Sequence, residues 1–346
     1  MIRSKMMIAT LFLCAAFSCC GAAQAAPEEG QVAVRLEIVG TADDKEPIFM
    51  PGEPIEARAF VTVGKGEPVD RRLVLHVGDV AFEFGSSSCF LPLRKTVHAE
   101  EGRETTEIEY VFPLFLTPQL LVERDKIGYL FSQPGRYEVW AEDVIRGEGE
   151  KRTPSEKIHV RIQELKPEEQ AVFEAYTRLM SVPILLLCRE EDFEKEYAAA
   201  GAPAVEAFLQ EHATSYYGPI VLFAKTVYEK ETILRRPMAN KADALERMRA
   251  HAQLADAFQK VAESTSNAYV RQRALFELAF ARTTGGEYEA ACRALNELLS
   301  EFPTGTLCGE AAKRLKEITD HRERLQKRKE ELKDVPAVPP APANAE

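Results

Sequence analysis

The sequence lacks the short motifs by which enzymes are most often recognised. Its 346 residues contain no Gly-x-Ser-x-Gly turn, no His-Glu-x-x-His helix and no glycine loop that could cradle a phosphate. The six histidines are scattered without metal-ligand spacing, and no Cys-x-x-Cys occurs. No helix start follows the serine run before Cys89, so we interpret that run as a polar loop and not as a nucleophile turn. We therefore predict a non-catalytic protein without cofactor or metal, and keep an enzyme assembled from distant residues as an alternative.

Positive charge is also too sparse for nucleic-acid binding. Lys and Arg total 44 against 55 Asp and Glu, which gives a formal net charge of -11. Binding to a phosphate backbone requires basic residues gathered on one face, and no segment of the sequence gathers them. We predict no nucleic-acid partner and expect a protein or peptide instead.

Apolar runs long enough for a permanent membrane span are missing. The apolar run at residues 6–17 has 12 residues, whereas a membrane-spanning helix needs about 20. Two basic residues precede this run, and a small-x-small site follows it at Ala23-Gln24-Ala25. We predict that residues 1–25 are a secretory signal peptide cleaved after Ala25, and that the protein is exported to the periplasm, the cell surface or the extracellular space.

A lipid anchor is the alternative interpretation of the same region. Cys19 and Cys20 follow a stretch that resembles a bacterial lipobox, although Phe17 stands where that motif has a small residue or Leu. Lipidation at Cys19 or Cys20 would tether the exported protein to a membrane without a transmembrane helix.

Four of the seven cysteines lie beyond the signal peptide, and an even number permits disulfides in an oxidising compartment. Cys292 and Cys308 are expected on two antiparallel helices, at heights that differ by roughly 9 Å along the helix axis, which is too far for a disulfide. We predict free thiols at these two positions. The pairing of Cys89 and Cys188 stays open.

Residues 31 to about 163 alternate between apolar and polar side chains, a period of two that is typical of strands with one buried face. Turn residues separate the alternating segments, and short strands at this spacing favour an antiparallel β-sandwich. At least six strands are expected, at residues 32–38, 55–63, 73–77, 108–112, 137–141 and 158–162.

Two turn motifs in this half resemble a known class of domain. Pro51-Gly52-Glu53-Pro54-Ile55 precedes one strand and Pro134-Gly135-Arg136-Tyr137 precedes another. Both are similar to the turns of immunoglobulin-like or fibronectin-like domains of bacterial surface proteins. That resemblance implies a domain used for adhesion, spacing or docking, with no catalytic residues to carry over.

Two aromatic residues stand out on the polar faces of these strands. Trp140 alternates out of phase with its apolar neighbours and should share a face with Glu138 and Glu142, and Phe60 interrupts a polar face in the same way. An outward ring either packs against a neighbouring domain or stacks on a sugar. We favour packing against the helical half, and keep a surface carbohydrate-binding protein as the alternative function.

The periodicity changes to three and four after Lys166, with Pro167 at the expected first helical turn. We therefore divide the chain into a β-domain at 26–164, a helical domain at 165–334 and a disordered Pro/Ala tail at 335–346. The expected fold class is all-β plus all-α, an antiparallel β-sandwich followed by an array of α-helical hairpins.

One segment of the helical half resembles a complete tetratricopeptide unit, and looser copies lie near 208–215 and 263–266. The unit spans residues 272–305. Its matching positions are Leu275, Leu278 and Ala279 on the first helix, Tyr288, Ala291, Leu295 and Leu298 on the second, and Pro303 at the end. The resemblance implies stacked hairpins with an inner groove for a partner.

Four residues of the first helix are the candidate binding residues because they lie off its packing positions. These are Gln272, Arg273, Phe276 and Glu277. We expect Phe276 to be the anchor of a bound peptide, with packing against the preceding hairpin as the alternative. The predicted function is an exported scaffold or adaptor that binds a partner protein in the cell envelope.

Overall fold

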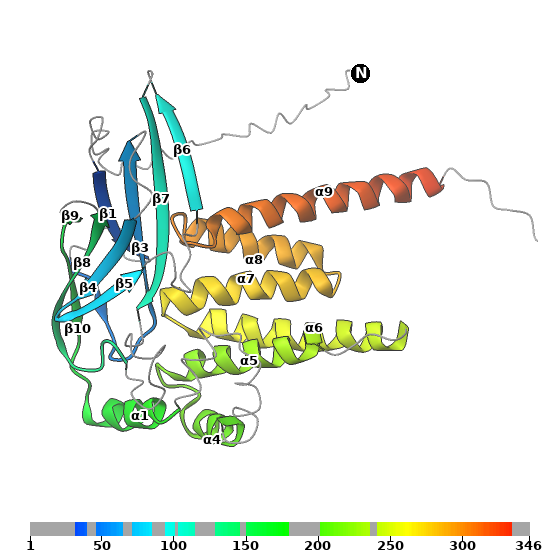
Figure 1. The fold of residues 1–346 in the computed structure, drawn as a ribbon. Coiled ribbons are helices and arrows are strands. Elements are labelled where there is room, and N and C mark those ends of the chain that lie inside the picture. Colours follow the sequence, from blue (N-terminus) through cyan, green and yellow to red (C-terminus); the bar gives the residue numbers. More distant parts are fainter. Residues whose placement is uncertain are drawn as a thin grey trace, which may run out of the picture.

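A computed structural model describes residues 32–39, 46–64, 71–84, 94–100, 103–114, 129–145, 150–179, 201–235 and 241–333. Several predictions fall outside these residues: the signal peptide at 1–25, lipidation at Cys19 or Cys20, the state of Cys89 and Cys188, and the tail at 335–346. Within the described part, the chain forms strands first and helices afterwards (Figure 1).

The strands form two sheets, which we call the β3 sheet and the β8 sheet. The β3 sheet has the order β1-β3-β7-β6 and consists of β1 (Val32–Ile38), β3 (Ile55–Gly64), β7 (Arg103–Leu114) and β6 (Arg94–Glu100). The β8 sheet has the order β2-β10-β8-β4-β5 and consists of β2 (Ile48–Phe49), β10 (Ile158–Ile162), β8 (Gly135–Ile145), β4 (Arg71–Val77) and β5 (Val80–Phe84), with β9 (Lys151–Pro154) beside β8.

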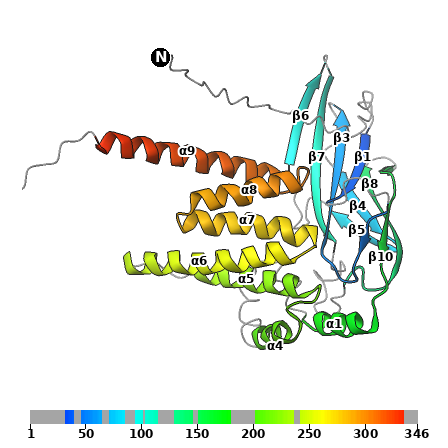
Figure 2. The ribbon, with the colours of Figure 1, turned by 180° about the vertical axis from the view of Figure 1, so that it is seen from behind.

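The alternating apolar residues of both sheets enclose one core. On β3, Ala57 and Ala59 are fully buried, and Ala57 pairs with Phe112 of β7. Val139 and Val160 contribute from the β8 sheet. The outer face of β3, which is turned toward the helices (Figure 2), is buried at Glu56 and Phe60 and partly buried at Arg58 and Thr62. Strand β3 therefore forms the link between the β core and the helical half.

The predicted fold class is wrong, because the fold is mixed α/β. Strand β2 runs parallel to β10, with Arg161 opposite Ile48, so the β8 sheet is not antiparallel throughout. The strands and helices also share a buried interface and are not an all-β sandwich followed by a separate all-α array. Strand β2 has only two residues, and so short a strand leaves no alternation by which sequence could reveal it.

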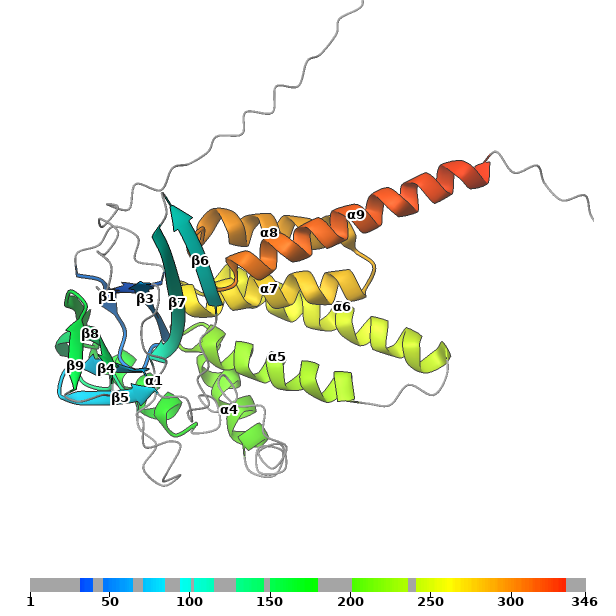
Figure 3. The ribbon, with the colours of Figure 1, turned by 45° about the horizontal axis from the view of Figure 1, so that its top comes forward.

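The change from strand to helix falls where the periodicity placed it, between Ile162 and Pro167. Helices α5 to α9 then pack in sequence as a stack that stands with one end against the β3 sheet, and α9 extends beyond α8 (Figure 3). The described helices are α1 (Pro167–Thr177), α4 (Ala202–His212), α5 (Gly218–Arg235), α6 (Lys241–Ser264), α7 (Ala268–Thr284), α8 (Tyr288–Glu301) and α9 (Cys308–Lys333). None of these helices combines the length and the apolar character that a membrane crossing requires.

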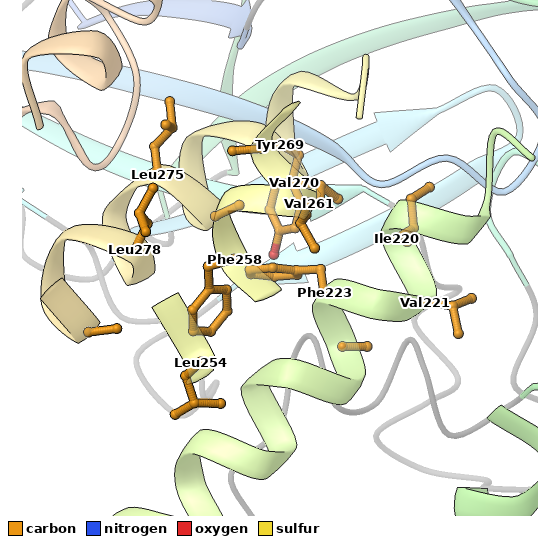
Figure 4. Close-up of a cluster of buried hydrophobic side chains, with 14 of the residues drawn as sticks. Ile220, Val221, Phe223, Leu254, Phe258, Val261, Tyr269, Val270, Leu275 and Leu278 are labelled. Atoms are coloured by element: carbon orange, nitrogen blue, oxygen red, sulfur yellow. The ribbon is translucent and has the colours of Figure 1, made fainter. Parts of the chain in front are cut away.

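The core of the stack is formed where α5, α6 and α7 meet. Phe223 of α5 lies 6.0 Å from Phe258 of α6 between ring centroids, and Leu275 of α7 belongs to the same cluster (Figure 4). Helices α7 and α8 form the expected hairpin within residues 272–305. Cys292 of α8 and Cys308 of α9 are half-buried, and neither forms a disulfide with another described residue.

The two halves are joined at the Pro51-Gly52 turn, which inserts among aromatic rings of the helical half. The Tyr217 hydroxyl donates a hydrogen bond of 2.8 Å to the carbonyl of Pro51, and the Tyr176 hydroxyl donates one of 3.4 Å to the carbonyl of Gly52. Gly52 has φ 67°, and a Cβ there would lie 2.8 Å from Cε2 of Phe173. The turn that resembles an immunoglobulin-like motif therefore docks the strands onto the helices.

Candidate functional site

Helix α7 is the centre of the candidate site, and its N-terminus is fixed on the β half. Asn267 caps the helix by accepting the backbone N–H of Val270 at 2.8 Å. The amide nitrogen of the same side chain donates to a carboxylate oxygen of Glu53 at 2.7 Å and to the carbonyl of Pro54 at 3.0 Å. A single capping residue thus orients α7 and ties it to the segment that leads into β3.

Glu53 is a buried acid with neutral hydrogen-bond donors around it. Its side chain is 6% exposed and accepts the backbone N–H of Met50 at 2.7 Å, the Asn267 amide and the Tyr216 hydroxyl. Burial raises the pKa of Glu53 to about 7, although the three donors lower it in part. The carboxyl group therefore changes its charge near neutral pH.

Glu56 lies on the outer face of β3, under the first turns of α7. It is 1% exposed, and one of its oxygens accepts the Thr306 hydroxyl at 2.7 Å and the Gln272 amide at 3.4 Å. Burial raises the pKa of Glu56, and the Arg273 guanidinium 3.9 Å from its other oxygen acts in the opposite direction. This cluster fills the joint between the sheet and the helix.

The prediction for Gln272 is therefore wrong. Its side chain is 0% exposed and is docked on Glu56, so it has no free surface to offer to a partner. Arg273 lies at the edge of the same joint, with its guanidinium carbon 4.4 Å from the centroid of Tyr269. Helical periodicity placed both residues off the packing face of the hairpin, but it gave no information that a sheet covers that side.

The middle of α7 is different, because two half-exposed aromatic rings lie there one helical turn apart. Phe276 and Phe280 flank the guanidinium of Arg314 from α9, whose carbon is 5.4 Å from each ring centroid. Lys230 of α5 lies 5.7 Å from the Phe280 centroid and donates to Glu277 at 2.9 Å. We call these five residues the α7 face.

A histidine lies behind this face. His251 of α6 is fully buried, with its ring centroid 5.8 Å from that of Phe280. Neither ring nitrogen has a hydrogen-bond partner among the described residues. Burial lowers the pKa of His251, and the positive charges of Arg247 and Lys230 lower it further. The imidazole is therefore neutral over most of the physiological range.

The α7 face offers the Arg314 guanidinium and two half-exposed apolar rings, which are groups for binding, whereas the Lys230 side chain is buried. Lys230 is occupied by ion pairs with Glu277 and Glu231, at 2.9 and 3.4 Å. Over the described ranges, no three His, Cys, Asp or Glu side chains come together in a way that could hold a metal ion. The chemistry of the face is that of recognition through charge and aromatic contact.

Within the described part of the chain, the ring contacts of Trp140 come from the β half and not from the helices, contrary to the favoured interpretation. It lies on the outer face of the β8 sheet, where its ring stacks on His76 of β4 with a centroid distance of 4.5 Å. Lys157 covers it from the side of β10, with its amine 4.8 Å from the ring centroid. Because neighbours on both sides cover the indole, a sugar could stack on it only by displacing one of them.

Phe60 is also covered, although it lies on the sheet that faces the helices. It is 6% exposed, and the guanidinium carbons of Arg35 and Arg58 lie 4.1 and 4.7 Å from its ring centroid. Arg58 in turn donates to the carbonyl of Thr304 in the turn between α8 and α9. Phe60 thus supports an arginine that reaches the helical half, and its ring is closed to a ligand.

A separate cleft of about 820 Å³ lies at the edge of the β8 sheet, beside β2. Ile48 is 59% exposed there, and Arg136 forms an ion pair of 2.6 Å with Glu46. The cleft lies on the β half, away from the candidates on α7, and charged side chains of both signs line it, from Glu46, Arg136, Arg161 and Glu164.

No family model matches this sequence, and no curated protein matches it either. The assignment of a function therefore depends on the geometry of the α7 face.

Three residues of the site were missed by sequence reasoning. Phe280 follows Phe276 by four residues, so the helical period could have identified it as part of the same face. Lys230 and Arg314 come from helices far from α7 in the sequence, and no local pattern indicates that they meet it.

Proposed function

We propose that this protein is a non-catalytic, exported scaffold or adaptor of the cell envelope that binds a partner protein through the α7 face. The observation that carries the proposal is the pair of half-exposed rings, Phe276 and Phe280, that lie together beside the Arg314 guanidinium. Aromatic and arginine side chains supply most of the strong anchors at protein interfaces. Export and the envelope location rest on the signal-like sequence of residues 1–25.

The rigidity of the surrounding fold supports this proposal. The α7 helix is capped by Asn267, and its N-terminal part is docked on Glu53 and Glu56 of the β half. A surface whose side chains are already held in place loses less conformational entropy when a partner binds. The β half therefore serves as the support that orients the binding helices.

The test compares Phe276→Ala with Trp140→Ala as a matched control, since both remove an aromatic side chain but only the first lies on the α7 face. Each purified protein is crosslinked in envelope extract, and captured proteins are identified by mass spectrometry. We expect a specific partner to be captured by the wild type and by Trp140→Ala and to be lost with Phe276→Ala.

Melting temperatures of the variants decide whether Phe276 acts in binding or in packing. Truncating a fully buried Phe to Ala lowers the stability of the fold by about 3 to 5 kcal/mol. Truncating a half-exposed anchor should lower it clearly less. Capture that survives in folded Phe276→Ala would exclude the α7 face as the binding surface. Capture that is lost only with Trp140→Ala would move the site to the β8 sheet.

A further inference from the structure

Arg314 differs from Lys230 of the α7 face and from Arg273 at the joint because it has no acidic partner among the described residues. Lys230 is paired with Glu277, and Arg273 lies 3.9 Å from Glu56. No carboxylate of the described residues lies within ion-pair distance of Arg314, and its Nε–H is inaccessible to solvent and lacks an acceptor.

The acidic residues of α9 that are nearest to Arg314 in the sequence do not pair with its guanidinium. Glu310 and Glu317, four residues before and three after Arg314, are both exposed, and neither forms an ion pair with it. A carboxylate that binds a guanidinium partly desolvated between aromatic rings stabilises it strongly, because each group replaces its contact with water by a charge-assisted hydrogen bond. The unmatched charge therefore indicates what a ligand should supply.

We propose that Arg314 binds the side-chain carboxylate of an Asp or Glu residue in the partner, and that apolar residues flank this acid on both sides. This inference rests on the proposed function, and it specifies the chemistry of the partner. The flanking positions follow from the geometry, because Phe276 and Phe280 lie one turn apart with the guanidinium carbon 5.4 Å from each centroid. A segment that crosses the face meets an apolar ring on either side of the cation, so the acid is internal to the segment and is not a chain terminus.

A single negative charge fits this site better than a phosphate. One guanidinium lacks a counter-ion, and Glu277 and Glu231 surround the neighbouring Lys230. A phosphate carries a charge close to -2 at neutral pH, so its second charge would face acids in place of cations. A carboxylate matches the one unpaired cation.

The test begins with a displayed library of random peptides selected on the purified wild-type protein. The tightest peptide is then measured by fluorescence anisotropy, together with an analogue in which its acid is replaced by the amide, an analogue with an amidated C-terminus and one with phosphoserine in place of the acid. We expect the amide to bind about tenfold to a hundredfold more weakly, and the amidated terminus to bind unchanged.

Protein variants then locate the contact. Arg314→Met keeps the apolar stem over the two rings and removes the charge, whereas Arg314→Lys keeps the charge and loses the planar fork. Lys316→Met is the control, because Lys316 is an exposed cation on the same helix. Arg314→Met should bind the acidic peptide as weakly as the wild type binds the amide, Arg314→Lys should fall between, and Lys316→Met should match the wild type.

The outcomes separate this inference from the proposed function. If selected peptides lose affinity with Phe276→Ala but bind Arg314→Met normally, the carboxylate site is wrong and the α7 face remains the binding surface. Tighter binding of the phosphoserine peptide, or loss of affinity on C-terminal amidation, would also overturn the internal carboxylate. If no peptide is selected, or none depends on Phe276, both proposals fail. The amide analogue tests the idea on unmodified protein, so the result does not depend on any variant folding.

Discussion

Replacing Glu53 with Gln should remove a large part of the pH dependence of stability. Glu53 is buried at the joint between the strands and α7, where burial raises its pKa from 4.5 to about 7. Such an acid binds its proton more tightly in the folded state than in the unfolded state. The free energy of unfolding is therefore highest below about pH 4.5, falls as the pH rises toward 7 and then levels off.

The size of the effect follows from the difference in pKa. One pKa unit corresponds to about 1.4 kcal/mol, so this group should lower the wild-type stability by about 3 kcal/mol between pH 4.5 and 8. The amide introduced by Glu53→Gln cannot ionise, but only one of its two polar atoms is an acceptor, whereas Met50 and Asn267 each donate to an oxygen of Glu53. The variant should thus be about 1 kcal/mol less stable at low pH and about 2 kcal/mol more stable at pH 8.

The assay is urea unfolding of both proteins from pH 4.5 to 8.5, followed by circular dichroism. The difference between the two proteins isolates Glu53, because Glu56, whose pKa burial also raises, is present in both. Glu156→Gln is the control, since this exposed side chain should leave the pH profile unchanged. A stability difference between Glu53→Gln and wild type that stays constant to within about 1 kcal/mol across the range would refute the reasoning.

Three further changes test the joint and the core. Gly52→Ala should lower the free energy of unfolding in urea by at least about 2 kcal/mol, because the new Cβ would clash with the Phe173 ring in addition to the strain of a positive φ. Gly286→Ala is the control: its φ is 81° but nothing lies near a Cβ there, so it should lower the free energy of unfolding by only about 1 kcal/mol, and equal losses in the two variants would exclude the clash. His251→Phe should raise the free energy of unfolding by about 1 to 3 kcal/mol, because it removes two buried nitrogens that have no partner among the described residues. It should also remove the loss that His251 contributes below about pH 6.5, where the unfolded imidazole takes up a proton first, so the gain in stability that Glu53 gives toward low pH becomes larger; a less stable variant would mean that the nitrogens are satisfied. Residues 26–164 and 165–334, which periodicity assigns to two domains, should each give broad, low-temperature transitions in calorimetry when expressed separately, because the two halves share a buried joint. Sharp transitions in both halves would show two independent domains.

Local features of the fold could be predicted because local sequence determines them. Strand β1 has the predicted bounds, since its alternation reflects one buried face, and α1 begins at the predicted Pro167. Pairing between distant segments was not predictable in the same way. Strand β2 pairs in parallel with β10 across the whole β half, and a two-residue segment carries no periodic signal of that partner.

The candidate site was predictable only in part, for a related reason. Helical periodicity separates the residues that pack within a hairpin from those that do not, and it correctly set Leu275 and Leu278 in the core. It does not tell what covers the other side of the helix. The sheet covers Gln272. Phe276, one turn further along α7, packs in part against the helical core, which is the alternative kept open from sequence, and its remaining surface lies half-exposed beside Arg314.

The position of the buried acids explains why one helix can carry both the joint and the proposed binding surface. Glu53 lies at the N-terminus of α7, where the unpaired N–H groups and the helix dipole favour negative charge. Its contacts fix the position and direction of the helix, so the rings further along α7 are held in a defined orientation. A change at Glu53 should therefore alter affinity at the α7 face without touching it, whereas Arg314→Met should alter affinity and leave the joint intact. Measuring peptide binding and the pH profile of both variants would distinguish the support of the site from the site itself.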